Sequence, residues 1–456
     1  MLESENNIIN MQSLPEHAML FNLAWPVIIS LFIQGLYNFI DSVFVARLGA
    51  EALSAVSISF VAQNLASSFF AGIATGMNAI ISRSIGAGNK YNGRNAMKSG
   101  FMIQSLISLF FILFGMISVE LYFDSTSDNA LVNAYGVLYL KPLMLFCPVM
   151  ALQITAERLL QATGLTRYML YSQIVGTIVN VILDPVMIFG LLGFPEMGIV
   201  GAVYATILGQ LVAALLAILF NFRKNKLIFF KDESVSSFDL ETVWMTLRIG
   251  LPTAAMGISA SFGNYFINRI LISFSASANA SFGVYAKLQS IALMPTEGMS
   301  AALVTMYSFF YGKKEFLRMK RTLKVGEIMV EAWCIFCFIL FSVFPVALMQ
   351  PFSPTAEMIV VGVHCFRIIG ITYLTSGLMT GLVAFFQATG HSTYSFLISL
   401  SRMVFVRVPV AYFLKSFNRI ELIWWCWPIS EVVSDTVCIL LFSKCYKQIK
   451  SQFYLK

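Results

Sequence analysis

The stretch Gln161-Ala162-Thr163-Gly164 occurs twice in this chain, because Gln387-Ala388-Thr389-Gly390 repeats it 226 positions later. Further residues match at the same offset, in the pairs Pro26 and Pro252, Asn38 and Asn264, Gly136 and Gly362, Tyr168 and Tyr394, and Lys141 and Arg367. The 456-residue chain is therefore predicted to contain two copies of one unit of about 226 residues. Duplicated apolar halves often enclose a central cavity between two mobile lobes in carriers.

Composition indicates that most of the surface faces lipid. Apolar residues make up 58% of the chain and charged residues 12%, whereas a typical soluble domain is about 25% charged. Lipid offers no partner for loose backbone amides, and the apolar runs are too continuous for the alternating strands of a barrel. The sequence predicts an all-α integral membrane protein with twelve transmembrane helices in two six-helix lobes. The predicted spans lie near residues 20–46, 53–82, 99–123, 131–157, 168–192, 198–222, 247–274, 281–311, 325–350, 357–386, 394–415 and 421–443.

Charge in the connections predicts the orientation. Lys and Arg collect in one set of loops and in the C-terminal tail, at Arg83, Lys90, Arg94, Lys98, Arg223, Lys224, Lys226, Lys231, Lys313, Lys314, Arg318, Lys320, Arg321, Lys444, Lys447 and Lys450. Because basic loops stay in the cytoplasm, both termini are predicted to be cytoplasmic. The net charge of +7 then follows from topology and gives no support to nucleic-acid binding.

The same pattern divides the chain into five predicted parts. These are a cytoplasmic tail at 1–19, an N-lobe at 20–222, a cytoplasmic linker at 223–243, a C-lobe at 244–443 and a cytoplasmic tail at 444–456. The polar, acidic start and the length of the first apolar run are unlike a cleaved signal peptide.

Several motifs resemble the multidrug and toxic compound extrusion (MATE) transporters. The match to their fifth and sixth helices comprises residues 180–185 and 188–190, with Gly198, Gly201, Ala202, Ala205, Thr206 and Gln210. The segments 26–49 and 82–89 are similar to the first helix with its following loop and to the end of the second helix. The resemblance implies a V-shaped pair of lobes in the cytoplasmic membrane and secondary active efflux of cationic, amphipathic compounds.

Two carboxylates lie within predicted spans, where an ionised side chain costs at least about 3 kcal/mol and tends to be functional. Asp184 has Asn180 one helical turn before it. Asp41 shares its helical face with three polar residues, Tyr37, Asn38 and Gln34. Desolvation and like charge both oppose ionisation of two converging carboxylates, so the pair is expected to bind a proton or a sodium ion.

In MATE proteins of the archaeal and DinF-like type, matching aspartates form a cation site in the N-terminal lobe together with an asparagine and a tyrosine. The resemblance therefore implies this role for Asp41, Asp184, Asn180 and Tyr37, with Thr206 as an added hydroxyl ligand. A sodium ion would bind at Asp41, Asn180 and Asp184, and no other metal site is expected. The alternative is that these groups only tie helices together, at about 0.6 kcal/mol for each hydrogen bond.

Prolines and one further acid extend the list of candidates. Pro26 and Pro185 weaken the hydrogen-bond ladder of their helices and are predicted hinges. Glu297 lies mid-span between Pro295 and Gly298, where it is a candidate for binding a cation or a cationic substrate. Asn38 and Gln34 are candidates for the same contact.

The remaining intramembrane charges favour structural roles. Lys141 and Arg367 occupy equivalent sites of the two repeats and are predicted to anchor their helices at the interface. Glu431 and Asp435 lie one turn apart in the last span. They are predicted to pair with arginines of the previous span, at Arg402 or Arg407.

The pattern of acids also bears on the energy source. The second half has no acid in the middle of its fourth helix, where the sodium-coupled NorM-type branch has one, and none in its first helix, which favours the DinF-like branch and protons over sodium. No GxxxxGK[ST] motif is present, so ATP is not the expected energy source.

The predicted function is antiport of a cationic drug or toxin against H+ or Na+ by alternating access. The alternative is a flippase for lipid-linked oligosaccharides, which the same superfamily contains, although such a protein would be expected to line its cavity with basic residues. An intramembrane enzyme would need a motif such as HExxH or GxSxG, and none is seen. We therefore expect no enzymatic activity, no cofactor and a monomer in the bilayer.

Overall fold

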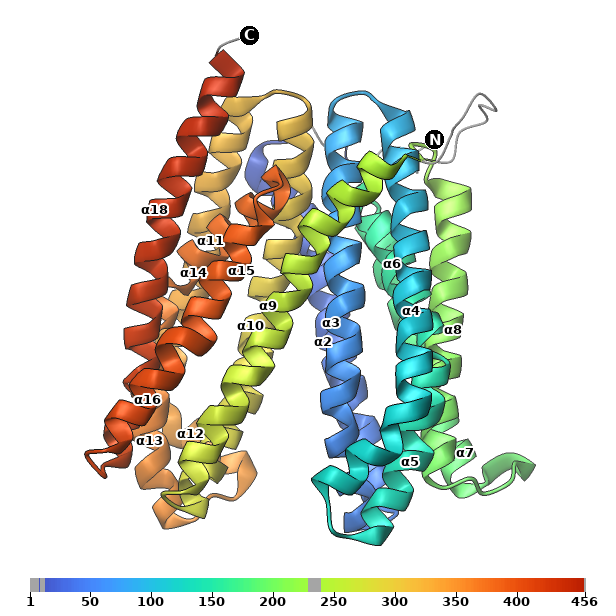
Figure 1. The fold of residues 1–456 in the computed structure, drawn as a ribbon, viewed down its shortest axis with the longest axis vertical. Helices are drawn as coiled ribbons and strands as arrows, with labels where there is room; N and C mark the ends of the chain where they lie inside the picture. The colour runs from blue at the N-terminus through green and yellow to red at the C-terminus, as the bar shows by residue number, and fades with distance from the viewer. Residues whose placement is uncertain (1–7, 9–12, 229–238, 455–456) are drawn as a thin grey trace. The chain divides into compact units, whose positions relative to one another are not determined.

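The computed structural model describes residues 8, 13–228 and 239–454, and these residues are helical almost throughout. The first half contains α2 (Glu16–Ala46), α3 (Ala50–Gly86), α4 (Lys90–Thr126), α5 (Ala130–Leu145), α6 (Cys147–Ala162), α7 (Thr166–Phe189), the short η2 (Leu191–Gly193) and α8 (Ile199–Lys224). The second half contains α9 (Leu240–Ile272), α10 (Ala276–Gly312), α11 (Phe316–Val343), α12 (Pro345–Met349), η3 (Gln350–Phe352), α13 (Ala356–Gly370), α14 (Tyr373–Thr389), α15 (Ser392–Leu400), η4 (Ser401–Val406), α16 (Arg407–Lys415), α17 (Ile420–Ile423) and α18 (Cys426–Tyr454). Figure 1 shows these helices along the chain, and the all-α prediction is confirmed.

Eight of the described helical segments are long and apolar enough to cross a membrane. Two bent pairs, α5 with α6 and α13 with α14, raise this number to ten when each pair counts as one span. Helices α9 and α10 are 33 and 37 residues long, but small and polar residues lower their hydropathy. Together these segments follow the order of the twelve predicted helices.

Both bent pairs interrupt spans that the sequence predicts as single helices. The chain bends by 50° at Phe146, between α5 and α6, and by 45° between α13 and α14. Pro142 lies inside α5 and Pro148 in the first turn of α6, where each proline removes a backbone donor. Thr372, in the second break, lies 226 residues after Phe146. The two bends therefore fall at equivalent positions of the two repeats.

The described residues divide into two compact units. Unit 1 contains the residues up to Ser13 and Trp25–Ala254, and unit 2 contains Leu14–Ala24 and the residues from Ala255 onward. The first helix of each repeat is thus shared, since the start of α2 belongs to unit 2 and the start of α9 belongs to unit 1.

Two glycines explain how the start of α9 joins unit 1. A Cβ atom on Gly72 of α3 would lie 2.5 Å from the backbone nitrogen of Ala254 and 2.6 Å from the carbonyl oxygen of Gly250. A Cβ atom on Gly76 would lie 2.6 Å from the carbonyl oxygen of Thr246. Helices α3 and α9 therefore pack backbone to backbone, as small residues four apart allow in membrane proteins.

In unit 2 the start of α2 is held by α11. Arg318 Nε donates to Glu16 Oε1 over 3.0 Å, and Arg318 Nη2 donates to the carbonyl oxygen of Leu14 over 3.0 Å. The same guanidinium lies 4.6 Å from the ring centroid of Phe310. Arg318, predicted from its charge to mark a cytoplasmic loop, thus also fixes the beginning of the first long helix.

The packing of α3 against α9 gives a stability test. We expect Gly72→Ala to destabilise the detergent-purified protein by about 1–3 kcal/mol, because overpacking a tight contact costs that much. Gly283→Ala is the matched control, since a Cβ atom at Gly283 of α10 would meet nothing within 4 Å. Thermal unfolding of both variants checks the difference, and equal midpoints would contradict the close approach of α3 and α9.

Candidate functional site

The two intramembrane carboxylates that the sequence singles out lie close together inside unit 1. Asp41, near the end of α2, is 7% exposed, and Asp184, on α7, is fully buried. The two side chains are near enough for their charges to interact. Among the described residues, no hydrogen-bond partner meets Asp41 Oδ1 or Asp184 Oδ2. The structure therefore brings both acids to one buried place with acceptor oxygens to spare.

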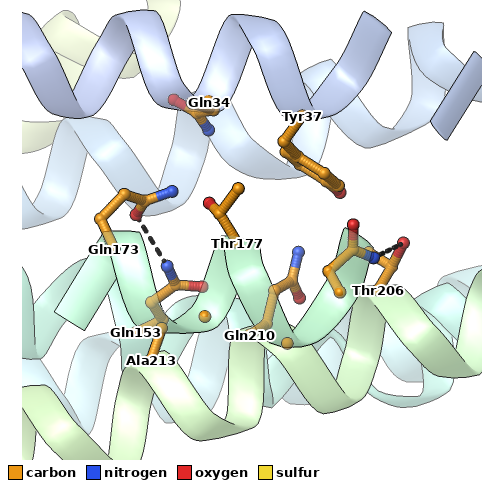
Figure 2. Close-up of a pocket in the computed structure, with 11 residues that line it drawn as sticks. Gln34, Tyr37, Gln153, Gln173, Thr177, Thr206, Gln210 and Ala213 are labelled. Carbon is orange, nitrogen blue, oxygen red and sulfur yellow. Dashed lines mark hydrogen bonds between the residues drawn. The ribbon is translucent and has the colours of Figure 1, made fainter. Parts of the chain in front are cut away.

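Asn180 connects Asp184 to the neighbouring helix. Its Nδ2 atom lies 3.4 Å from Asp184 Oδ1 and 3.4 Å from Thr206 Oγ1 on α8, as donor to both. The Tyr37 side chain of α2 also lies close to Thr206 and to both acids. Figure 2 shows Tyr37 close to Thr206 at one end of a pocket. The structure thus assembles Tyr37, Asn180 and Thr206 beside the two acids.

Glycines bring α7 and α8 close enough for this contact. A Cβ atom on Gly209 of α8 would lie 2.8 Å from the Asn180 Cβ atom and 2.8 Å from the Gly176 carbonyl oxygen. A Cβ atom on Gly176 of α7 would lie 2.7 Å from the Ala213 Cβ atom. The absence of side chains at Gly176 and Gly209 therefore sets the distance between Asn180 and Thr206.

Two residues of this site were missed by the sequence analysis. Tyr139 of α5 is 4% exposed and interacts electrostatically with Asp41, Tyr37 and Asp184. It also lies close to Gln63 of α3. Neither residue is marked by spacing from Asp41 or Asp184, because they come from other helices and meet the acids through tertiary packing.

A small polar cavity extends from this cluster into unit 1. Its volume is about 50 Å³, which has room for roughly three or four water molecules. The lining is mostly amides and hydroxyls, from Gln34, Tyr37, Gln153, Gln173, Gly176, Thr177, Asn180, Thr206, Gly209, Gln210 and Ala213. Figure 2 shows the hydrogen bond between Gln153 and Gln173 at one end and Thr206 at the other. None of the lining residues is basic.

The oxygen atoms of this cluster suit a proton or a hard cation. Asn180 Oδ1 is a third buried oxygen for which the described residues supply no partner, beside Asp41 Oδ1 and Asp184 Oδ2. Carboxylate, amide and hydroxyl oxygens are the ligands that hard cations prefer. Buried acceptor atoms without donors are energetically costly. A bound cation or proton would therefore stabilise this arrangement of oxygen atoms.

The other predicted site residues differ in how they lie relative to the cavity or in which unit they belong to. Gln34 lines the cavity, whereas Asn38 is exposed and is not part of its lining. Glu297 is exposed on α10 in unit 2. Pro26 lies inside α2, where its carbonyl oxygen accepts a 2.9 Å hydrogen bond from Ser30 Oγ, and Pro185 lies inside α7. The hinge function of both prolines stays a prediction.

Charged groups outside the cluster have varied contacts. The predicted pairing of Asp435 with an arginine is wrong, because neither carboxylate oxygen of Asp435 has a hydrogen-bond partner among the described residues. Lys141 Nζ lies 2.8 Å from Glu120 Oε1, and Arg367 Nε donates over 3.2 Å to the carbonyl oxygen of Ser342. Arg402 Nη1 donates to Glu431 Oε1 over 3.1 Å, which confirms one predicted pair. Arg402 belongs to the π-helical segment η4, and such segments often occur at special sites.

Comparison with known proteins identifies relatives along most of the chain. The family model MatE matches residues 26–186 and 252–413, two segments that begin 226 residues apart. The probable multidrug resistance protein YoeA of Bacillus subtilis is 27% identical over 417 residues, which cover 90% of this chain and 89% of that protein. An FAD transporter of Shewanella oneidensis is 24% identical over 447 residues, covering 96% of this chain and 97% of that protein.

Solved structures show the same fold. A MOP superfamily transporter from Pyrococcus furiosus superposes with a TM-score of 0.87 at 21% identity, covering 95% of this chain and 97% of that one. A multidrug resistance MATE family transporter in an outward-facing conformation superposes with a TM-score of 0.88 at 20% identity, covering 96% of this chain and 97% of that one. The predicted MATE-like fold is therefore confirmed.

The bonds made by Thr206 can be tested without any assay of activity. We expect Thr206→Val to destabilise the protein by about 1–3 kcal/mol, because the buried Asn180 loses a hydrogen-bond partner. Thr436→Val is the control, since Thr436 is exposed on α18 and its hydroxyl donates to the Val432 carbonyl oxygen of its own helix. If the two variants unfold at the same temperature, the Thr206 hydroxyl does not hold the cluster together.

Proposed function

The chain belongs to the MatE family of membrane transporters, and from this premise we propose that it exports cationic, amphipathic compounds in exchange for protons or sodium ions. Members of the family are transporters and not enzymes. The proposal includes a place in the cytoplasmic membrane with both termini in the cytoplasm, and a DinF-like rather than NorM-type coupling site.

One observation carries this proposal. Asp41 and Asp184 are buried together beside a polar cavity, and the described residues leave an oxygen of each without a hydrogen-bond partner. A carboxylate pair in such surroundings gains most from a positive charge, whether this arrives as a proton, a sodium ion or a cationic substrate. Competition between these cations for one site is what exchange requires.

The mechanism follows from that competition. With Asp41 and Asp184 ionised, the site favours a cationic substrate. When a proton or sodium ion binds from the other side of the membrane, it neutralises the pair and the substrate loses its electrostatic partner. Each ligand changes the affinity for the other by the same factor, and alternating access then turns an ion gradient into export. Asn180 orients Asp184 through their hydrogen bond and is itself hydrogen-bonded to Thr206, with Tyr37 beside them.

The names of most of these relatives support drug export, but one relative is named for the transport of a different compound. Curated relatives include the probable multidrug resistance protein of Bacillus subtilis and the multidrug export protein MepA of Staphylococcus haemolyticus, which is 24% identical over 435 residues. The Shewanella oneidensis relative is named as an FAD transporter. FAD carries negative phosphates, which two buried carboxylates would repel. The acid pair therefore favours a cation as the substrate of this chain.

The flippase alternative has weaker support. A lipid-linked oligosaccharide carries an anionic pyrophosphate, which is best held by arginine or lysine. The polar cavity of unit 1 is lined by amide, hydroxyl, phenol and small side chains. Acids contact this lining, since Asn180 bonds to Asp184 and Gln153 bonds to Glu157, and their sign is wrong for such a ligand.

Transport by the purified protein in liposomes tests the proposal. We expect Asp41→Asn and Asp184→Asn each to reduce exchange of a cationic dye by about tenfold or more, because the coupling between ion and substrate is typically 5- to 150-fold. Proton and sodium gradients are imposed separately, with FAD as the anionic comparison substrate. Asp128→Asn, at an exposed carboxylate between α4 and α5, is the matched control.

The outcomes separate the parts of the proposal. The gradient that drives the parent protein identifies the coupling ion. Faster transport of FAD than of the dye would overturn the cationic substrate class. Dye exchange at the parent rate in both aspartate variants, after correct insertion, would overturn the coupling site.

A further inference from the structure

A third buried carboxylate lies in unit 1, outside the coupling pair. Glu157, on α6, is 8% exposed. Its Oε1 atom accepts a hydrogen bond of 3.1 Å from Gln153 Nε2 and a longer one of 3.5 Å from Ser172 Oγ of α7. An intramembrane acid is costly to keep, and neither the antiport mechanism nor the repeat accounts for this one.

The groups that face Glu157 are mainly neutral. From its own helix these are Gln153 and the charged Arg158, and from α7 it is the hydroxyl of Ser172. Helix α8 packs nearby through Asn221, whose Nδ2 atom donates to the Ala156 carbonyl oxygen over 2.9 Å. Arg158 acts on Glu157 electrostatically, while its Nη1 atom donates to Gln161 Oε1 over 2.6 Å. The surroundings of Glu157 therefore suit a carboxyl group that alternates between neutral and charged forms.

Glu157 is connected to the polar cavity through one shared amide. Gln153 Nε2 lies 3.1 Å from Glu157 Oε1 and also 3.1 Å from Gln173 Oε1, and both glutamines line the cavity. Figure 2 shows the Gln153–Gln173 bond, with Thr177 between it and the end near Tyr37 and Thr206. At that other end Asn180 contacts Asp184.

The cavity therefore lies between two buried acidic sites, Glu157 at one end and the Asp41–Asp184 pair at the other. These sites are too far apart for direct proton transfer. Gln173 and Asp184 are eleven residues apart on α7, which is about 17 Å at 1.5 Å per residue. The 50 Å³ cavity is polar and has room for roughly three or four ordered water molecules, which shorten the gap that a proton must cross between the two sites.

We propose that Glu157 is a second proton-binding residue of this lobe, which exchanges protons with the Asp41–Asp184 pair through water in the amide-lined cavity. The proposal rests on the proposed function and specifies the path of its coupling ion. In the transfer, an O–H bond of the aspartate pair breaks, one O–H bond forms at the Glu157 carboxylate, and the intervening waters each accept and donate one proton. No other bond changes.

The position of Glu157 determines where this path leads. Glu157 lies near the last turn of α6, which ends at Ala162. The turn that follows contains Gly164 and is tied to α3 by the hydrogen bond of 2.9 Å from Ser82 Oγ to the Ala162 carbonyl oxygen. This end of the lobe also holds the basic loop after α3, which the charge pattern assigns to the cytoplasm. Glu157 is thus placed to release the coupling proton on the cytoplasmic side.

The test uses two variants of the full-length protein in liposomes. Glu157→Gln keeps a side chain of the same shape, and Gln173→Leu makes the cavity apolar next to it. We expect both to bind a cationic dye with an affinity within about twofold of the parent, yet to exchange it about tenfold more slowly under a proton gradient. Their exchange rates should also depend less on the pH of the cytoplasm-facing compartment. Glu120→Gln is the matched control, because Glu120 is exposed and paired with Lys141.

Three results would overturn the proposal. The first is exchange by Glu157→Gln at the parent rate and with the parent pH profile. The second is a loss of dye binding and thermal stability in Glu157→Gln and Gln173→Leu, which would make the cluster structural. The third is a parent protein driven by sodium alone, which would leave export intact but remove the proton path. Failure of the antiport site itself is seen separately, as unchanged exchange in Asp184→Asn.

Discussion

The charge of a carboxylate in a region without water must be balanced by hydrogen bonds or by a positive charge. Unit 1 buries two such carboxylates near each other. Asp41 and Asp184 face each other's charge, and the described residues leave an oxygen of each without a donor. The neutral Asn180 donates one hydrogen bond to Asp184 and another to Thr206. We propose that the oxygens left without a donor make this lobe a site for an exchangeable cation, and the proposed antiport depends on it.

The fold holds this unfavourable arrangement in place by close helix packing elsewhere. Gly176 and Gly209 let α7 and α8 approach until Asn180 reaches Thr206. Gly72 and Gly76 bring the start of α9 onto α3 in the same way. Small residues therefore determine the geometry of a site whose chemistry lies in polar residues. The first helix of each repeat is shared between the units, so movement of α2 would displace Tyr37 and Asp41 together.

Much of the fold can be predicted from the sequence, because a long apolar run allows few structures in lipid. The repeat of 226 residues indicates the symmetry, and the matched breaks at Phe146 and Thr372 agree with it. The breaks themselves are not predicted, since a bent pair and a straight helix have the same average hydropathy. Prolines occur in both straight and bent helices of this chain, so Pro142 alone gives no decisive signal.

The candidate site is predicted only where its residues share a helix. Asn180 and Asp184 are one turn apart, so their spacing reveals the contact. Tyr139, Gln63 and Glu157 lie on other helices, and helical spacing cannot show which faces will meet. The opposite applies to Glu297, which the sequence singles out but which is not part of the acid cluster. Its neighbours Pro295 and Gly298 make it conspicuous in the sequence, but it lies in unit 2, whereas both acids of the pair belong to unit 1.

The central claim is that substrate and coupling ion compete for the charge of Asp41 and Asp184. The most direct measurement is calorimetric titration of the purified protein with a cationic dye, in buffers of different ionisation enthalpy and with or without sodium. The account predicts that dye binding releases a proton or displaces sodium, and that this release is lost in the variant with both aspartates replaced by asparagine. Binding of the dye with no proton released, no effect of sodium and unchanged affinity in that variant would contradict it.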